Sequence, residues 1–459
     1  MKLCWNARHG KILLELVSKL EKERIRYFIL RNYKGLPNIN ESKDVDIIIE
    51  PGQLRKSKKV LIDIYKKSGL DYYCETIYGK VHCLLGMDIK QECSIHIDLI
   101  EGYLAKGYEL FSFEELYKHT IRYKNFVVMN DFFDAFMLYI YKQFGYKNPK
   151  LKDEYRECIF KVYNENPKEF QELLIRVTDE KFAKKICENI KNNEFDKVIN
   201  LSGSLTKKLR LYIWKKKPVR TFKNVLGFWF QKANRILFNY KKYAKTFAVM
   251  APDGTGKTTF LDALLEQLCF YYVNVPEDNR FSVYHFRPSI LPNLGAVGEK
   301  AGVMKQDTNF TDPHRSKPAN KFSSFIRISY YTLDYILGWQ KCVRKDVQFD
   351  RYTIFDRYSY DFLVDPLRTK LNLPYNIRKF FVSLTPQPKL VFLLSASPET
   401  IFERKQELTL PEIQRQMGEY QRVANKDMER FIILDAEKSP DEMVTDAITI
   451  LLDKFACKL

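Results

Sequence analysis

The residues best suited to chemistry lie in one stretch, TFAVMAPDGTGKTTFLDALL, at positions 246–265. An apolar run at 247–250 predicts a buried strand, and apolar residues at helical spacing over 258–268 predict a helix. A glycine-rich turn between a strand and a helix is the context in which backbone amides bind phosphate. Lys257 can reach the β- and γ-phosphates of a nucleotide, and Thr258 can ligate magnesium. The stretch therefore predicts a site for ATP and Mg²⁺.

Two residues of this loop are unusual. Ala251 stands where such loops normally begin with glycine, and Asp253 places a carboxylate, which repels phosphate, inside the loop. We expect Asp253 to accept a hydrogen bond from a hydroxyl of the phosphoryl acceptor; the alternative is a solvated charge at the loop tip. The residues expected to contact the nucleotide are Ala251, Gly254, Thr255, Gly256, Lys257, Thr258 and Thr259.

The letters FDRY occur twice, at 349–352 and 355–358, with a short predicted strand between the two aspartates. Ligands of parallel sheets bind beyond the carboxyl ends of the strands. We therefore assign Asp356 and Arg357, which follow the strand, to the site. Asp356 is expected to order magnesium, and Arg357 to hold a phosphate with two hydrogen bonds. Asp350 precedes the strand and is expected to lie on a solvated edge.

The stretch PDGTGKTT at 252–259 resembles the phosphate-binding loop of the thymidylate kinase family, and the Asp-Arg-Tyr at 356–358 resembles that family's motif at the end of the corresponding strand. The resemblance covers about 246–459. It implies that Asp253 contacts the sugar hydroxyl of the acceptor and that Arg287 grips the acceptor phosphate. Several stretches look more like thymidylate kinase-like proteins of bacterial surface-polysaccharide gene clusters, namely HFRP, FDRYSYDFLVDPLR and ERKQEL.

Further cations are candidates for the acceptor side and for a lid. His314, Arg315 and Lys317 lie in a predicted loop and are assigned to the acceptor. Arg404 and Arg415 lie in or next to predicted helices, where a mobile lid would use their charge during transfer, as kinases of the resembling family do. An ordinary surface helix is the alternative for each of them.

A second group of acids lies near the N-terminus. Asp44 and Asp46, in SKDVDIIIE, share one face of a predicted strand, and Asp98 lies on another predicted strand. Three carboxylates on adjacent strands can hold two Mg²⁺ ions. With Gly35 in a preceding turn, this pattern resembles the nucleotidyltransferase superfamily, although Leu36 replaces that family's second small residue. The alternatives are a pair of edge-strand acids and a nucleotidyltransferase fold without activity.

The predicted elements divide the chain into three regions of an α/β protein. Residues 1–125 form an α+β, nucleotidyltransferase-like domain, and residues 126–245 form a helical region. Residues 246–459 form a P-loop domain, in which a parallel sheet is flanked by helices. The strands expected in this last domain are 247–250, 283–286, 352–355, 390–394 and 431–434.

The composition of the chain indicates where in the cell the protein is expected. The chain has 459 residues, 45% of them hydrophobic, and no run of 18 apolar residues that would predict a transmembrane helix. Its nine cysteines form no CxxC pair, which favours free thiols in a reducing cytoplasm. The first 16 residues lack the pattern of a signal peptide. We therefore expect a cytoplasmic protein.

The net charge of +19 is concentrated in one segment: 197–252 contains 14 Lys and Arg residues and no Asp or Glu. A helix predicted within 214–242 carries one apolar stripe beside these cations. It suits peripheral contact with the anionic inner face of a membrane, whereas the alternative buries it between the two catalytic domains. Nucleic acid binding ranks last, since no RNA-binding signature accompanies the charge. The stripe consists of Phe222, Val225, Leu226, Trp229, Ala233, Ile236 and Leu237.

These features together predict a bifunctional enzyme. The P-loop domain would phosphorylate a small acceptor, either a nucleotide or a sugar phosphate, with ATP and Mg²⁺. The N-terminal domain would add a possible nucleotidyltransferase activity, in surface-polysaccharide biosynthesis if the gene-cluster resemblance holds. The alternative is a nucleotide-gated binding or scaffold protein at a membrane-associated assembly, with an inactive N-terminal domain.

Overall fold

The protein is described by a computed structural model, which covers residues 5–40, 42–145, 149–272, 281–292 and 319–459. The chain divides into two compact units: unit 1 comprises 1–232 and 456–459, and unit 2 comprises 233–455. This division differs from the three expected regions, because most of the helical region packs with the N-terminal sheet into a single unit.

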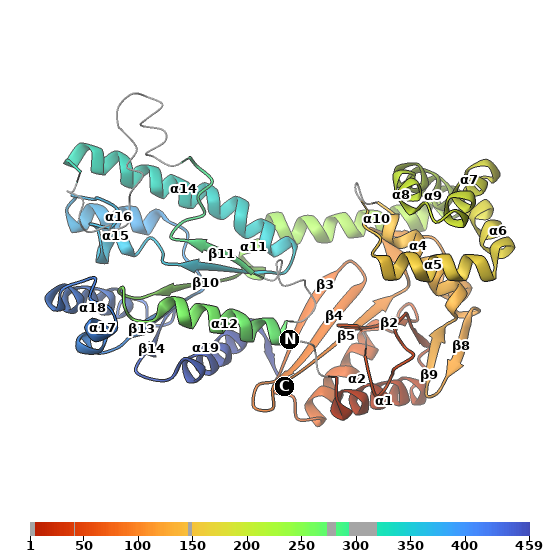
Figure 1. The fold of residues 1–459 in the computed structure, drawn as a ribbon, viewed down its shortest axis with the longest axis horizontal. Coiled ribbons are helices and arrows are strands. Elements are labelled where there is room, and N and C mark those ends of the chain that lie inside the picture. The colour runs from red at the N-terminus through yellow and green to blue at the C-terminus, as the bar shows by residue number, and fades with distance from the viewer. Residues whose placement is uncertain (1–4, 41, 146–148, 273–280, 293–318) are drawn as a thin grey trace. The chain divides into compact units, whose positions relative to one another are not determined.

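Unit 1 is built on a mixed sheet of eight strands (Figure 1) in the order β15-β3-β4-β5-β2-β1-β9-β8. The pairs β2–β5 and β1–β9 are parallel, and the other neighbours are antiparallel. The strands are β1 (Tyr27–Ile29), β2 (Val45–Ile49), β3 (Tyr72–Tyr78), β4 (Val81–Asp88), β5 (Cys93–Glu101), β8 (Thr120–Tyr123), β9 (Phe126–Met129) and β15 (Cys457–Lys458). A separate two-stranded ribbon consists of β6 (Leu104–Ala105) and β7 (Tyr108–Glu109).

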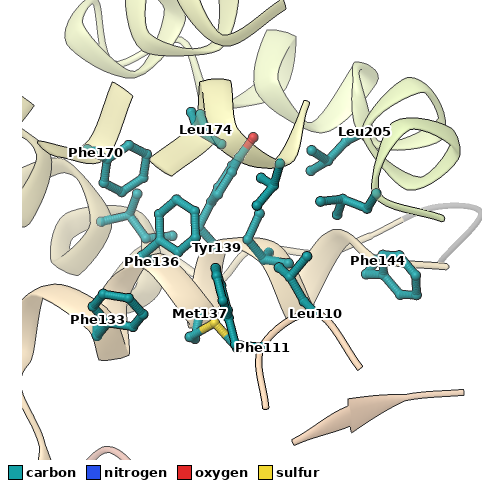
Figure 2. Packing of buried hydrophobic residues seen from close by; sticks show 14 of the residues in the cluster. Leu110, Phe111, Phe133, Phe136, Met137, Tyr139, Phe144, Phe170, Leu174 and Leu205 are labelled. Carbon is teal, nitrogen blue, oxygen red and sulfur yellow. The ribbon is translucent and has the colours of Figure 1, made fainter. Parts of the chain in front are cut away.

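Helices cover both faces of this sheet, and its central strands are accordingly buried along nearly their whole length: β1 is buried throughout, and β5 is buried at every position except Glu101. One core joins the sheet to α1 (Ala7–Lys22) and α2 (Leu54–Lys67). The other joins it to the helical region (Figure 2), where Phe136 and Tyr139 pack against Phe170 in a cluster that also contains Phe133 and Leu174. The helices of this second layer are α3 (Phe113–Tyr117), α4 (Asp131–Gln143), α5 (Asp153–Glu165), α6 (Pro167–Val177), α7 (Glu180–Lys191), α8 (Phe195–Asn200) and α9 (Ser202–Lys216).

The predicted basic helix is α10 (Pro218–Ala233), which begins at a proline, as expected. One side of it packs on unit 1: a Cβ at Gly107 would lie 2.7 Å from the Cα of Val225. The opposite side carries most of the apolar stripe. Phe222, Leu226 and Trp229 are each more than half exposed.

Unit 2 is a five-stranded sheet, all parallel, in the order β11-β12-β10-β13-β14 (Figure 1). Every strand predicted in this region is present within two residues of its expected bounds. The strands are β10 (Lys245–Met250), β11 (Phe281–His285), β12 (Tyr352–Asp356), β13 (Leu390–Ser395) and β14 (Phe431–Asp435). The parallel sheet of the expected P-loop fold is thus confirmed.

Helices flank both faces of this sheet as well. On one face, Phe260 of α12 (Lys257–Tyr271) packs on Phe392 of β13, and α19 (Pro440–Phe455) lies beside α12. The other face packs against a core to which α14 and its neighbours contribute. The remaining helices are the π-helical turn η1 (Asn234–Phe238), α11 (Tyr240–Tyr243), α14 (Lys321–Gln348), α15 (Asp361–Val364), α16 (Tyr375–Leu384), α17 (Pro398–Arg404) and α18 (Leu410–Ala424).

Candidate functional site

The glycine-rich loop connects β10 to α12, as the sequence predicted. Gly254 and Gly256 have φ angles of +91° and +90°, a region that side chains with a Cβ rarely enter. A Cβ at Gly254 would also lie 3.0 Å from the carbonyl oxygen of Ile401. Thr255 is buried and donates a hydrogen bond to the carbonyl of Pro252 at 3.0 Å. Backbone geometry therefore favours glycine at both positions, and packing adds to this at Gly254.

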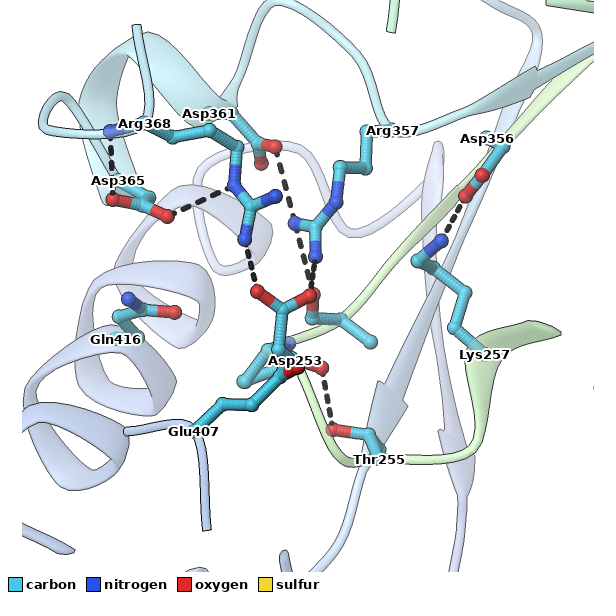
Figure 3. Close-up of polar contacts among 12 residues, drawn as sticks. Asp253, Thr255, Lys257, Asp356, Arg357, Asp361, Asp365, Arg368, Glu407 and Gln416 are labelled. Carbon is cyan, nitrogen blue, oxygen red and sulfur yellow. Dashed lines mark hydrogen bonds and ion pairs between the residues drawn. The ribbon is translucent and has the colours of Figure 1, made fainter. Parts of the chain in front are cut away.

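Lys257 and Asp356 meet at the carboxyl ends of β10 and β12, where Lys257 Nζ contacts Asp356 Oδ1 (Figure 3). His285, at the end of β11, places Nδ1 2.8 Å from Asp356 Oδ2. Burial raises the pKa of Asp356, but the hydrogen bonds from His285 and Lys257 outweigh it and hold the pKa well below its usual range. A fully ionised carboxylate therefore lies beside the loop lysine, on the edge of the sheet where it was expected.

Asp253 is the centre of an ion-pair network rather than a solvated loop tip (Figure 3). Arg357 contacts its Oδ1, and Arg368 contacts its Oδ2. Arg357 also lies 3.2 Å from Asp361 Oδ2, and Arg368 lies 3.1 Å from Asp365 Oδ2. The network thus joins the loop to α15 and to the turn after it. Because each carboxylate oxygen carries two lone pairs, Asp253 can still accept a hydroxyl hydrogen bond.

Arg357 differs from the expectation that it offers two hydrogen bonds to a phosphate. Its side chain is only 3% exposed, and one terminal nitrogen lies 3.3 Å from the carbonyl of Ala251 as well as near Asp361. Tyr420 donates to the other oxygen of Asp361 at 2.8 Å. The Arg357 guanidinium therefore hydrogen-bonds to acceptors of the protein itself. Arg368 is partly exposed and is the cation of this network that is more accessible to a ligand.

Arg287 follows β11 and is held in place by α14. Its Nη1 contacts Asp334, which is fully buried, and its guanidinium lies 5.0 Å from the centre of the Tyr331 ring. The other oxygen of Asp334 accepts a hydrogen bond from the amide of Leu291 at 2.8 Å. The remaining acceptor-side candidates, His314, Arg315 and Lys317, lie outside the described residues.

The two lid candidates occupy different places. Arg404 ends α17 and donates to the carbonyl of Ala436 at 3.0 Å. Arg415, on α18, pairs with Glu412 and donates to the carbonyl of Val364 at 2.9 Å. The segment that follows Arg404 comes closer to the loop: a Cβ at Gly254 would lie 3.2 Å from the Cβ of Lys405. Each arginine thus has protein partners in this structure.

The expectation of a solvated Asp350 is wrong. Its carboxylate lies 2.8 Å from Arg235 and 3.0 Å from Lys245, and its side chain is 18% exposed. The reason is that Lys245 begins β10 directly beside the start of β12, so its charge needs a partner there. The other half of the expectation is confirmed, because Asp350 precedes the strand whose far end carries Asp356.

In unit 1 the three predicted carboxylates come together. One carboxylate oxygen from each of Asp44, Asp46 and Asp98 lies within 4.8 Å of the others. The register of β2 and β5 accounts for this, since Asp46 pairs directly with Asp98. Arg31 lies 2.5 Å from Asp46, but burial, followed by the charges of the neighbouring acids, raises the pKa of Asp46. Such a cluster would gain from a bound cation.

A cavity of about 370 Å³ lies in the same unit, between the β3–β4 turn, the 102–107 segment and α10. Ile100, two residues along β5 from Asp98, lines it together with Phe228. Lys80, Lys106 and Lys223 contribute positive charge to its wall. The cavity is therefore suited to an anionic molecule with an apolar part.

Four residues of the unit 2 site were not predicted: His285, Asp334, Asp361 and Arg368. His285 is the first residue of the HFRP stretch and lies near the end of the strand predicted at 283–286. Its position at the carboxyl end of a strand could have indicated that it belongs to the site. Asp361 stands four residues after Arg357, a helical pairing distance. Asp334 lies 47 positions from Arg287, and Arg368 lies 115 positions from Asp253, so no local pattern marks these two contacts.

The fold and loop define unit 2 as a P-loop α/β unit. No family model matches the chain. Over 213 residues the chain is 25% identical to a protein of Methanosarcina barkeri (strain Fusaro / DSM 804) named "Probable thymidylate kinase", covering 44% of this chain and 92% of that protein. A solved thymidylate kinase from Ehrlichia chaffeensis aligns with 45% of this chain and 97% of its own, at 12% identity and a TM-score of 0.30. The chain is thus similar to thymidylate kinases over somewhat less than half of its length.

Proposed function

We propose that unit 2 is an ATP-dependent kinase whose acceptor is a phosphorylated nucleotide or sugar. The observation that carries the proposal is the meeting of Lys257 and the ionised Asp356 beside the glycine-rich loop. Sequence similarity to the Methanosarcina barkeri protein supports a nucleotide kinase. Stretches after the loop resemble thymidylate kinase-like proteins of surface-polysaccharide gene clusters. On this basis we also propose a role in surface-polysaccharide biosynthesis.

The residues of the loop fit a nucleotide and its magnesium ion. Gly256 opens onto free space and is the N-cap of α12, and a helix N-terminus is favourable for an anion. Thr258 and Asp356 would hold Mg²⁺, which when bound neutralises phosphate charge. Lys257, now paired with Asp356, would turn to the transferred phosphoryl group. Asp253 and Arg287 would position the acceptor, with Arg404 and Arg415 as lid cations.

A screen with ATP and Mg²⁺ tests the proposal. Purified protein is incubated with nucleoside monophosphates and sugar phosphates, and products are identified by mass spectrometry. We expect ADP formation that depends on one class of acceptor, with a product heavier by one phosphoryl group. Binding of ATP without turnover on any acceptor would contradict the kinase and indicate the nucleotide-gated scaffold instead.

Asp253→Ala is expected to impair use of the acceptor more than binding of ATP. The substitution removes the acceptor contact and releases Arg357 and Arg368, which now share the carboxylate. A hydrogen bond to a charged group contributes about 1.5–3 kcal/mol, or roughly 10- to 150-fold in kcat/KM for the acceptor. The two constants are measured by steady-state kinetics with each substrate varied in turn. A loss confined to ATP affinity would remove the acceptor role of Asp253.

For unit 1 we propose metal-dependent binding of a nucleoside triphosphate, with nucleotidyl transfer as the activity, since Asp44, Asp46 and Asp98 lie together. We expect Ala at any of the three positions to abolish Mg²⁺-dependent triphosphate binding, because two-metal sites fail when a shared ligand is lost. Calorimetry on the full chain measures this, in a Lys257→Ala background that silences the loop of unit 2. If triphosphate binding survives each of the three substitutions, Asp44, Asp46 and Asp98 do not form a metal-dependent site in unit 1.

We further propose that α10 contacts an anionic membrane surface. Its exposed apolar side chains lie within the segment that carries 14 cations and no acids, and each cation near such a surface contributes about 1 kcal/mol. Among the described residues, no helix has both the length and the apolar composition needed to cross a bilayer.

Trp229→Glu is expected to abolish flotation with anionic vesicles, because it places a negative charge in the exposed apolar stripe. The parent should float with anionic vesicles at low salt and remain in solution at high salt. Leu211→Glu is the matched control, since Leu211 is also exposed but belongs to α9. If the parent never floats, or if Trp229→Glu unfolds the protein, the stripe is an internal packing surface.

A further inference from the structure

A second set of possible metal ligands shares Asp98 with the acidic cluster. In the sheet of unit 1, Asp98 of β5 has Asp46 beside it on β2 and Cys83 beside it on β4. His96 precedes Asp98 by two residues and therefore points to the same face. The register thus places a thiol, an imidazole and a carboxylate on one surface of three neighbouring strands.

These three side chains converge on one point. Sγ of Cys83, a ring nitrogen of His96 and an oxygen of Asp98 lie within 4.8 Å of one another. His96 is 3% exposed and Asp98 is 9% exposed. Asp98 Oδ1 is buried, and His96 Nε2 lies 2.7 Å from it. A thiol, an imidazole and a carboxylate that converge in a buried site are placed as ligands of a common ion would be.

We propose that Cys83, His96 and Asp98 bind a divalent transition-metal ion of the zinc class, adjacent to the acidic cluster. Sulfur and imidazole ligands favour Zn²⁺ or Co²⁺ over Mg²⁺, which prefers oxygen. Bond lengths of about 2.0–2.3 Å put tetrahedral ligand atoms about 3.3–3.8 Å apart. The ligands therefore need to move by only about 1 Å, and the thiol proton of Cys83 passes to solvent on binding.

Asp98 would then belong to two metal environments. The atoms of Asp44 and Asp46 that lie near it form the hard, oxygen-only side, and Cys83 and His96 form the softer side. Three protein ligands leave a fourth position open, as in zinc sites that bind water or substrate. All of these ligands belong to unit 1, so metal binding here is independent of the kinase activity proposed for unit 2.

Cobalt spectroscopy tests this directly. The full chain is freed of metal with a chelator and titrated with Co²⁺, whose bond to a thiolate absorbs in the near ultraviolet. We expect one equivalent to produce this band, Zn²⁺ to abolish it by competition, and excess Mg²⁺ to leave it unchanged. Cys83→Ser should remove the band, whereas Cys158→Ser, which changes an exposed thiol elsewhere in the unit, should retain it.

His96→Gln provides a second variant that leaves the sulfur in place. It should weaken Co²⁺ binding by more than the roughly 10- to 100-fold lost when an outer partner of a metal ligand is removed. A band that persists in Cys83→Ser, or a folded parent that gives none, would overturn the proposal and leave Cys83 and His96 as neighbours that only stabilise Asp98. Because the readout is absorbance, an inactive kinase would not affect it.

Discussion

Lys257→Ala is expected to abolish acceptor-dependent formation of ADP while the protein stays folded. Lys257 is the loop cation, and its pairing with Asp356 shows that it reaches the carboxyl edge of the sheet. Removing one preorganised donor from a transition state costs about 10²- to 10³-fold in kcat. The measurement is kcat at saturating ATP and acceptor, together with the melting temperature of the variant.

Lys379→Ala is the control for this substitution. Lys379 is an exposed lysine on α16, so its loss changes the net charge equally without touching the loop. It should leave kcat within about twofold of the parent, since surface substitutions rarely disturb a site. Near-normal turnover of a folded Lys257→Ala protein would refute the kinase assignment.

Asp356→Asn is expected to produce the second large loss of activity. The amide keeps the shape of the side chain but removes the charge that His285 and Lys257 now hold ionised. With that charge gone, ordering of magnesium should weaken and kcat should fall by about 10²-fold or more. Titration of the reaction rate with Mg²⁺ measures both effects, and the requirement for magnesium should rise.

Asp350→Asn tests whether the first FDRY copy has a structural role while the second serves the site. This aspartate pairs with Arg235 and Lys245, so its substitution should lower the free energy of unfolding by about 1.5–3 kcal/mol. Well below its melting temperature, the variant should keep the kcat of the parent. Equal loss of kcat from both substitutions would show that the site does not lie at the carboxyl end of β12.

The sequence predicted those parts of the fold that depend on local patterns. Short runs of β-branched and aromatic residues marked all five strands of unit 2, and the rule that ligands bind at the carboxyl ends of parallel strands separated Asp356 from Asp350. The pairing of Asp253 with Arg368 spans 115 positions and depends on how the turn after α15 folds back. Such contacts are set by tertiary packing, which no local window contains.

In unit 1, too, local patterns predicted some features, whereas others depend on how the strands pair. Alternation along one strand placed Asp44 and Asp46 on a common face, but the position of Cys83 opposite Asp98 depends on the register of β4 and β5. That register is fixed by the turn between the two strands and by burial of one face, neither of which the spacing of polar residues indicates. Side chains near the acids therefore became visible only in the folded sheet.

The short strand β15 has a consequence for how the chain folds. It adds Cys457 and Lys458 to the edge of the unit 1 sheet, beside β3, after the chain has passed through all of unit 2. Unit 2 is therefore an insertion fastened at both ends. Contacts between segments this far apart form slowly, because a long loop must close first. During synthesis on the ribosome, β3 stays an open edge until Cys457 and Lys458 emerge, and in that interval it is most exposed to mispairing.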